Sequence, residues 1–225
     1  MDASRSHLAL IVPASNTVME PDFHRTGTDS PWTVSTWRIF LDSVTEEAEI
    51  RMLQEELPRC LTRIGTTAPD LVIFGCTSAG SLGGLEHDRE MTDDIRAQTG
   101  ATVVTVIGAM LAELEATRPG RVAIFTPYTD ELTSSVTRCV AEAGYEIACA
   151  KGMGFRDNAD IGRVTPEEIT AFVETGMVGV SADCVFLSCT NWRAIEAIDV
   201  LRSALGMPVL SSNQVTLEAS RRSTP

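Results

Sequence analysis

Two cysteines, Cys76 and Cys189, occupy matching positions in the segments LVIFGCTSAG and VFLSCTNWRA. Each follows a short apolar run typical of a buried strand and precedes a stretch with helical spacing. Backbone N–H groups at the start of a helix stabilise a thiolate, so we expect both thiols to have a lowered pKa. A thiolate is a nucleophile. The pair therefore predicts a site that uses both sulfurs, and the alternative is that both only pack at tight strand ends.

Further polar residues follow other apolar runs. In an open parallel sheet, ligands bind beyond the carboxyl ends of the strands, where the unpaired N–H groups of helix starts also gather. Such donors favour a small carboxylate as ligand. The candidate binding residues are Ser15, Asn16, Thr77, Ser78, Tyr128, Thr190 and Asn191. Helix capping by Ser15 or Asn16 and simple anchoring by Tyr128 are the structural alternatives.

The remaining cysteines predict neither a metal site nor disulfides. Cys60, Cys139, Cys149 and Cys184 form no CxxC pair and no spacing typical of zinc ligands. We expect all four to be small buried hydrophobic side chains. The glycine-rich GSLGG lacks the spacing of nucleotide-binding motifs, so no nucleotide cofactor is expected.

Apolar, β-branched runs alternate with longer segments of helical spacing along the whole chain. This pattern predicts parallel sheets covered by helices on both faces, because continuously apolar strands need two buried faces. We expect strands at residues 8–12, 33–38, 71–74, 102–106, 121–125, 146–150, 184–187 and 208–210. We expect helices at residues 45–64, 86–99, 108–117, 130–143, 166–176, 193–205 and 214–221. In the first helix, the spacing predicts a buried face of Ile50, Leu53, Leu57 and Leu61.

The chain also repeats itself. The spacing from Cys76 to Cys189 equals the spacing from Ser15 to Tyr128, and both pairs lie in a strand–loop–helix context. This predicts two α/β units of similar fold. The turn TRPG marks a boundary between them. We expect a first lobe of residues 1–117, a second lobe of residues 118–210, and a C-terminal helix at 211–225 that packs back on the first lobe.

Charge and hydropathy restrict the partners and the location. The formal net charge of −13 argues against nucleic acid or an anionic membrane as partner. Lys151 is the only lysine, which leaves one candidate for Schiff-base chemistry. No apolar run reaches the roughly 20 residues of a membrane span, and the first residues do not resemble a signal peptide. We therefore expect a cytoplasmic protein.

Four segments, IVPASNTVMEPDF, FGCTSAG, FTPYTDEL and LSCTNWRAIEAID, together resemble the aspartate/glutamate racemase superfamily. Within it, the chain looks most similar to the branch of maleate cis-trans isomerases and arylmalonate decarboxylases, over nearly its whole length. The resemblance implies two flavodoxin-like, doubly wound lobes with an active site between them, no metal and no organic cofactor. It implies that Cys76 and Cys189 are catalytic, that Asn16 binds a substrate carboxylate, and that Tyr128 and Asn158 match family positions.

The resemblance leaves several activities open. The first is isomerisation of a small dicarboxylate such as maleate, in which Cys76 adds to the double bond and Cys189 assists by proton transfer. The second is a two-thiol racemase or epimerase, including racemase-like proteins of ectoine breakdown. An arylmalonate-type decarboxylase, whose branch carries only the second-lobe cysteine, and a non-catalytic carboxylate-binding protein follow. Thr77 and Ser78 differ from the more apolar residues at this place in maleate isomerases, so the substrate stays open. Members of the family often pair, which implies a homodimer or a higher homo-oligomer.

Overall fold

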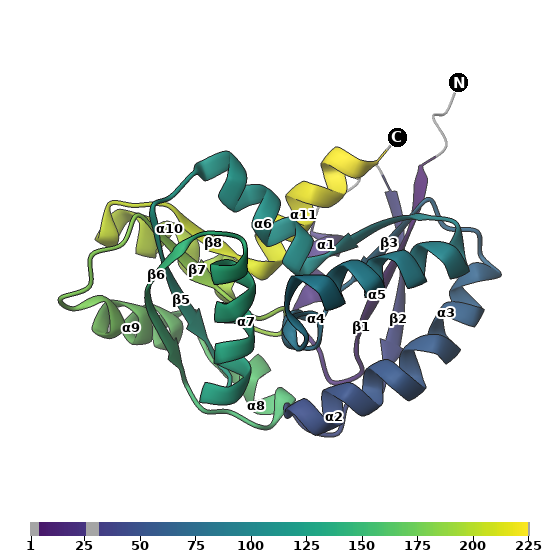
Figure 1. The fold of residues 1–225 in the computed structure, drawn as a ribbon, viewed down its shortest axis with the longest axis horizontal. Helices are drawn as coiled ribbons and strands as arrows, with labels where there is room; N and C mark the ends of the chain where they lie inside the picture. The colour runs from purple at the N-terminus through teal and green to yellow at the C-terminus, as the bar shows by residue number, and fades with distance from the viewer. Residues whose placement is uncertain (1–4, 26–31, 225) are drawn as a thin grey trace.

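Two parallel sheets with helices around them make up the computed structural model, which describes residues 5–25 and 32–224 (Figure 1). The first sheet has the strand order β2-β1-β3-β4, and the second repeats this order as β6-β5-β7-β8. All neighbouring strands in both sheets run parallel. The predicted α/β fold, with two units of the same topology, is therefore confirmed.

Each predicted strand is present, with small shifts at its ends. The strands are β1 (Ser6–Pro13), β2 (Trp32–Ile39), β3 (Leu71–Phe74), β4 (Thr102–Thr105), β5 (Arg121–Thr126), β6 (Glu146–Gly152), β7 (Cys184–Leu187) and β8 (Val209–Ser211). The strands β3 and β7 read LVIF and CVFL and are buried at every position. Both lie inside their sheets, which explains why neither shows an alternation of polar and apolar residues.

The helices cover the faces of the two sheets and the space between them (Figure 1). They are α1 (Met19–His24), α2 (Glu46–Arg51), η1 (Met52–Glu56), α3 (Leu57–Gly65), α4 (Thr77–Ser81), α5 (Gly84–Thr99), α6 (Val106–Thr117), α7 (Asp130–Glu142), α8 (Asn158–Arg163), α9 (Pro166–Met177), α10 (Ala194–Leu205) and α11 (Ser212–Ser223). The sequence pattern does not predict α1, α4 or α8, because so few residues show no helical period. Asn158, which lies outside the helices that the pattern predicts, is the first residue of α8.

The segment predicted as one helix at residues 45–64 consists of three consecutive pieces. The middle piece, η1, is a π-helix, and α3 follows it with Pro58 in its first turn. Proline has no N–H to donate to the preceding turn, so the regular ladder is interrupted there. The predicted buried face is wrong at Ile50, which is 38% exposed, whereas Ala48 and Met52 are buried instead. This rotation of the helix also turns Glu49 inward.

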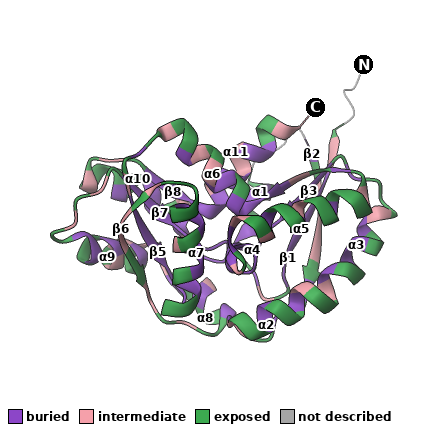
Figure 2. Ribbon diagram, in the orientation of Figure 1, coloured by how far each residue is buried: buried purple, intermediate pink, exposed green. Residues whose placement is uncertain are grey.

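The inner strands of the first sheet, β1 and β3, are buried on both faces. Along β1, Leu8, Leu10 and Val12 pack into one hydrophobic cluster, whereas Ala9 and Ile11 pack into another. Successive side chains of a strand point to opposite faces, which explains this division. Figure 2 shows the inner strands buried and the outward sides of the surrounding helices exposed, whereas the edge strands β2 and β6 are mostly half-exposed or exposed. The first cluster continues into the second sheet, so one apolar core connects the two lobes.

The C-terminal helix α11 packs against α6 and β4, which belong to the first half of the chain. The boundary between residues 117 and 118 itself stays a prediction. Within the described residues, no helix combines the length and the apolar composition that crossing a membrane requires.

Candidate active site

The loops after β1, β3, β5 and β7 meet at one small cavity. Most of the predicted site residues line this cavity: Asn16, Cys76, Ser78, Tyr128, Asn158, Cys189, Thr190 and Asn191. Its other lining residues, which the sequence pattern does not single out, are Pro13, Leu41, Val44 and Glu49. No lysine, arginine or histidine of the described chain lines it. The cavity therefore combines two thiols, neutral polar groups and one carboxyl group.

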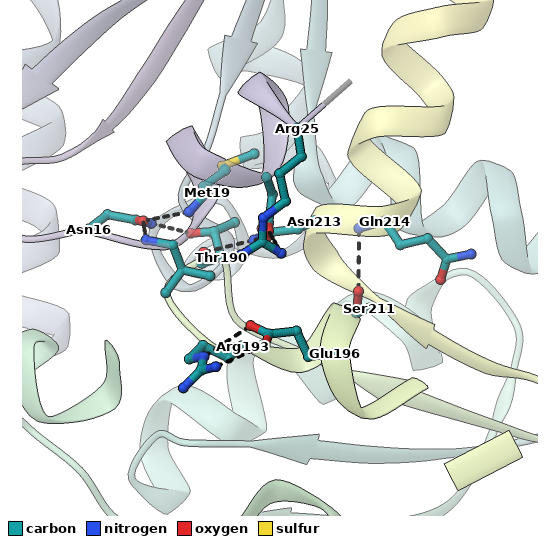
Figure 3. Close-up of polar contacts among 11 residues, drawn as sticks. Asn16, Met19, Arg25, Thr190, Arg193, Glu196, Ser211, Asn213 and Gln214 are labelled. Atoms are coloured by element: carbon teal, nitrogen blue, oxygen red, sulfur yellow. Dashed lines mark hydrogen bonds and ion pairs between the residues drawn. The ribbon is translucent and has the colours of Figure 1, made fainter. Parts of the chain in front are cut away.

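Hydrogen bonds between the two lobes hold the loops in place (Figure 3). Asn16 Nδ2 donates to Thr190 Oγ1 at 3.0 Å, and Thr190 Oγ1 donates to the carbonyl of Gly75 at 3.0 Å. Asn16 Oδ1 accepts from the backbone N–H of Met19, the first residue of α1, at 3.0 Å. Thr190 thus connects the second lobe to the residue that directly precedes Cys76.

A second set of contacts supports Thr190 from the side of α11 (Figure 3). Asn213 Nδ2 donates to the carbonyl of Thr190 at 3.1 Å and to Asp22 Oδ2 at 2.7 Å. Burial raises the pKa of Asp22, while the bond from Asn213 and the charge of Arg25 act in the opposite direction. Three segments that are far apart in the sequence therefore meet behind the cavity.

Asn158 and Asn191 form the opposite wall. Asn191 Nδ2 donates to Asn158 Oδ1 at 3.1 Å, and Asn191 Oδ1 accepts from the N–H of Thr17 at 2.8 Å. Asn158 Nδ2 donates to Ser15 Oγ at 2.9 Å. Ser15 therefore supports Asn158 and does not itself line the cavity. The predicted residue Thr77 does not line it either, because its hydroxyl shares a 3.1 Å hydrogen bond with Ser212.

Burial, and not the helix start, decides the protonation state of Cys76. The predicted helix start is present, because Cys76 is the N-cap residue of the short helix α4, but only 5% of Cys76 is exposed. Burial raises the pKa of the Cys76 thiol far above its ordinary value, and the nearby carboxyl of Glu49 adds to the rise. The N–H of Ala79 and the hydroxyl of Ser78 oppose this with a smaller effect. The expected lowering of the Cys76 pKa is wrong.

The prediction for Cys189 is wrong both in the pKa of its thiol and in its expected position at a helix start. The helix α10 begins only at Ala194, so no helix start lies next to this thiol. Burial raises the pKa of Cys189 to about 12, against the lowering effect of two donors, the Tyr128 hydroxyl and the N–H of Asn191 at 3.3 Å. Burial also raises the pKa of Tyr128, so its hydroxyl keeps its proton. Both thiols of the cavity are therefore protonated at neutral pH.

Glu49 is the functional candidate that the sequence pattern did not reveal. It is fully buried, and its Oε1 accepts a hydrogen bond from Ser78. Burial raises the pKa of Glu49 from 4.5 to about 8, and the charge of Glu46 contributes to the rise. Glu49 lies in the run EEAEI, whose carboxylates look alike in the sequence. One local signal is its position three residues before Met52, on the side of the helix that becomes buried.

The other cysteines have no part in the cavity. Cys60, Cys139 and Cys184 are buried, as predicted, but Cys149 on β6 is half-exposed, because β6 is an edge strand. All six cysteines are unpaired. No group of three or more His, Cys, Asp or Glu side chains in the described part of the chain has an arrangement that could hold a metal ion.

The repeated fold and the two thiols in its cavity define a class of protein: a two-lobed α/β protein whose cavity lies between equivalent strand ends and is lined by two cysteines. The family model for arylmalonate decarboxylase (Amdase) matches residues 8–222, and the chain therefore belongs to that family. Among its relatives, the maleate isomerase of Geobacillus stearothermophilus is 27% identical, over 96% of this chain and 90% of that protein. The arylmalonate decarboxylase of Bordetella bronchiseptica is 26% identical, over 94% of this chain and 87% of that protein.

Solved structures share the fold. The maleate cis-trans isomerase of Nocardia farcinica bound to Tris superimposes with a TM-score of 0.88 at 23% identity, covering 97% of this chain and 92% of that one. The maleate isomerase of Pseudomonas putida S16 with maleate has a TM-score of 0.87 at 21% identity, covering 96% and 90%. At this identity, the likeness shows the common architecture.

Proposed function

We propose that this chain isomerises maleate, or a closely similar small dicarboxylate, from cis to trans without a cofactor. The observation that carries the proposal is that Cys76 and Cys189 line one cavity between the lobes. Relatives that are maleate isomerases, at 24–27% identity, support the choice of substrate. A solved cysteine-to-serine variant of the Nocardia farcinica enzyme holds a covalently bound succinylcysteine, which supports a route by thiol addition.

In the proposed reaction, Cys76 is the nucleophile. Its sulfur forms a bond to one alkene carbon, and the π electron pair moves onto the neighbouring carboxylate as an enediolate. The former double bond is now single and can rotate. When the S–C bond breaks, the electron pair restores the double bond in the trans form, and fumarate leaves. Stabilising the charge of the enediolate is the main way in which such a site lowers the barrier.

Neutral amide groups are the proposed binders of the substrate carboxylates. Among the described residues, Asn16 Nδ2 donates one N–H to Thr190, and Asn158 Nδ2 donates one N–H to Ser15. Each side-chain amide carries two N–H donors, so a second one remains on both for a ligand. We assign carboxylate binding to Asn16 and Asn158, because the hydroxyls of Ser78 and Thr190 already donate to Glu49 and to the Gly75 carbonyl. Thr77 does not line the cavity.

Cys189 is the proposed proton partner: its thiol protonates the enediolate carbon to give a succinyl group on Cys76, and its thiolate takes that proton back as the S–C bond breaks. Its thiol accepts hydrogen bonds from Tyr128 and from the N–H of Asn191, and these donors stabilise the thiolate that would remain after a proton is given away. The same arrangement favours a second candidate function, a racemase or epimerase. In that reaction one thiolate removes a proton from Cα and the opposite thiol delivers one to the other face.

Proton NMR of the purified protein in D2O separates these functions. Fumarate formed from maleate supports the isomerase, and its absence refutes the proposed function. Deuterium uptake at Cα of amino or hydroxy acids indicates a racemase, and loss of CO2 from an arylmalonate indicates a decarboxylase. Cys76→Ser and Cys189→Ser should abolish or strongly slow turnover, whereas a carboxylate-binding protein would keep its ligand affinity in both. Cys149→Ser, outside the cavity, is the matched control.

We further propose that the enzyme needs no metal, acts in the cytoplasm and forms a homodimer or a higher homo-oligomer. Full activity after dialysis against EDTA is the expected result for the first point. Fractionation of the producing cells tests the location. Light scattering coupled to size-exclusion chromatography tests the oligomeric state, and a monomeric mass at working concentration would contradict it.

A further inference from the structure

Cys76, Ser78 and Glu49 form a chain of polar contacts along the wall of the cavity. Cys76 Sγ lies 3.8 Å from Ser78 Oγ, within the range of a sulfur hydrogen bond. Ser78 Oγ in turn donates to Glu49 Oε1. Because the serine proton points to the carboxyl group, the serine oxygen is left to accept from the thiol. These two hydrogen bonds are oriented so that a proton could pass from Cys76 through Ser78 to Glu49.

Packing alone does not account for Glu49. A carboxyl group without exposure is costly to bury unless its oxygens are satisfied. In the described part of the chain, Glu49 Oε2 has no hydrogen-bond partner. Glu49 also lines the cavity beside Cys76 and Ser78. A buried and half-satisfied carboxyl group next to a candidate nucleophile is typical of a functional site.

We propose that Glu49 takes up, through Ser78, the proton that Cys76 loses when its sulfur attacks the substrate. The inference rests on the proposed thiol addition. Glu49 acts through Ser78 and is therefore a positioning residue of the proton path. Cys76 remains the group that reacts with the substrate.

The step balances in atoms and charge. As the S–C bond forms, the S–H bond of Cys76 breaks and its proton passes to Ser78 Oγ. The hydroxyl proton of Ser78 passes to the carboxylate of Glu49, and the alkene π pair becomes the lone pair of the enediolate. Elimination reverses each transfer, so Glu49 ends as a carboxylate and Cys76 as a thiol. No oxidant, reductant or second reactant is consumed.

The surroundings of Glu49 suit a base that works near neutral pH. The ionisable groups that act on it are Glu46 on its own helix, Cys76 before α4, and Tyr128 and Cys189 from the second lobe. Burial raises the pKa of Glu49 to about 8. A carboxylate with a raised pKa is a stronger base than an exposed one, and it is available at mildly alkaline pH.

Charge repulsion and a proton path predict opposite effects of removing Glu49 on the reactivity of the Cys76 thiol. An ionised Glu49 disfavours the Cys76 thiolate by charge repulsion, so removing the charge would make the sulfur more reactive. A proton path makes the sulfur less reactive when Glu49 is removed. Glu49→Gln keeps the size of the side chain and abolishes proton uptake, so the sign of its effect separates the two cases.

The first test compares wild type, Glu49→Gln, Ser78→Ala and the double variant in maleate turnover across pH. We expect the wild-type kcat to rise with pH to a plateau above about 8, and Glu49→Gln to lose this rise along with about 100-fold in kcat. Ser78→Ala should show a similar loss, and the double variant no further loss. Glu47→Gln, exposed on the same helix, is the control and should match wild type. A rise with pH that persists in Glu49→Gln overturns the proposal.

The second test does not depend on the substrate. Iodoacetamide labelling of Cys76, followed by mass spectrometry, should be slower in Glu49→Gln and Ser78→Ala than in wild type. Equal or faster labelling in Glu49→Gln overturns the proton path. If maleate is not isomerised but labelling still depends on both residues, the proposed function fails and the proton path stands. If maleate is isomerised with identical pH profiles, the proton path fails alone.

Discussion

The buried carboxyl group of Glu49 makes a sharp prediction about stability. Burial raises its pKa from 4.5 to about 8, which means that the folded protein holds Glu49 preferentially in its protonated form. Such a group contributes its full stabilisation below the unfolded pKa, and this contribution is lost as the pH rises through the folded pKa. In Glu49→Gln no proton is released at this site, so the contribution stays constant with pH.

The size of the effect follows from the shift. One pKa unit corresponds to about 1.4 kcal/mol. Between about pH 5 and about pH 8, the Glu49 contribution falls by about 3.5 kcal/mol. The free energy of unfolding of Glu49→Gln should therefore gain about 3.5 kcal/mol relative to wild type over the same range. Other buried carboxyl groups, such as Asp22 and Asp88, are present in both proteins and cancel in the difference.

Urea unfolding followed by circular dichroism, at several pH values, measures this difference. Glu47→Gln on the exposed side of α2 serves as control, and its difference from wild type should not change with pH. A difference for Glu49→Gln that is independent of pH would show that Glu49 has an ordinary pKa. A difference of opposite sign would show that the fold stabilises the ionised carboxylate, and either result refutes the reasoning.

Three further predictions concern the supports of the cavity. Asn213→Ala should lower the free energy of unfolding by about 1–3 kcal/mol in thermal denaturation, because Asp22 loses its buried donor. Gly152→Ala should cost about 1–3 kcal/mol and lower kcat, because its new Cβ would clash with the Tyr128 carbonyl; unchanged kinetics would contradict this. Cys189→Ser, incubated with maleate, should accumulate a covalent adduct on the other thiol of the cavity, which mass spectrometry detects.

Much of the fold is predictable from the sequence because it depends on short-range patterns. LVIF and CVFL are stable only where both faces are covered, which makes them central strands of parallel sheets. The pattern from Thr165 to Glu168 is a capping box, and it starts α9 as expected. The repeat that relates Cys76 to Cys189 predicts two similar units, and the same strand order in both sheets confirms it.

Residues that act through long-range packing are not predictable in this way. Glu46, Glu47 and Glu49 look alike in the sequence, and only the position of Ser78 across the helix contact distinguishes Glu49. The predicted buried face of this segment is wrong at Ile50 for a similar reason. A π-helix and Pro58 interrupt the period on which the prediction depends, and Ile50 consequently faces solvent.

The sequence by itself determined which elements form, their order, and which polar residues come to the ends of the strands. It placed both cysteines at equivalent positions, because equivalent strand ends follow from the repeated pattern. Only the tertiary structure decided their protonation. A helix start favours the Cys76 thiolate through a few N–H groups, but burial, which leaves only 5% of Cys76 exposed, removes most of the water around it. Desolvation is the larger effect, so both thiols keep their protons in the resting protein.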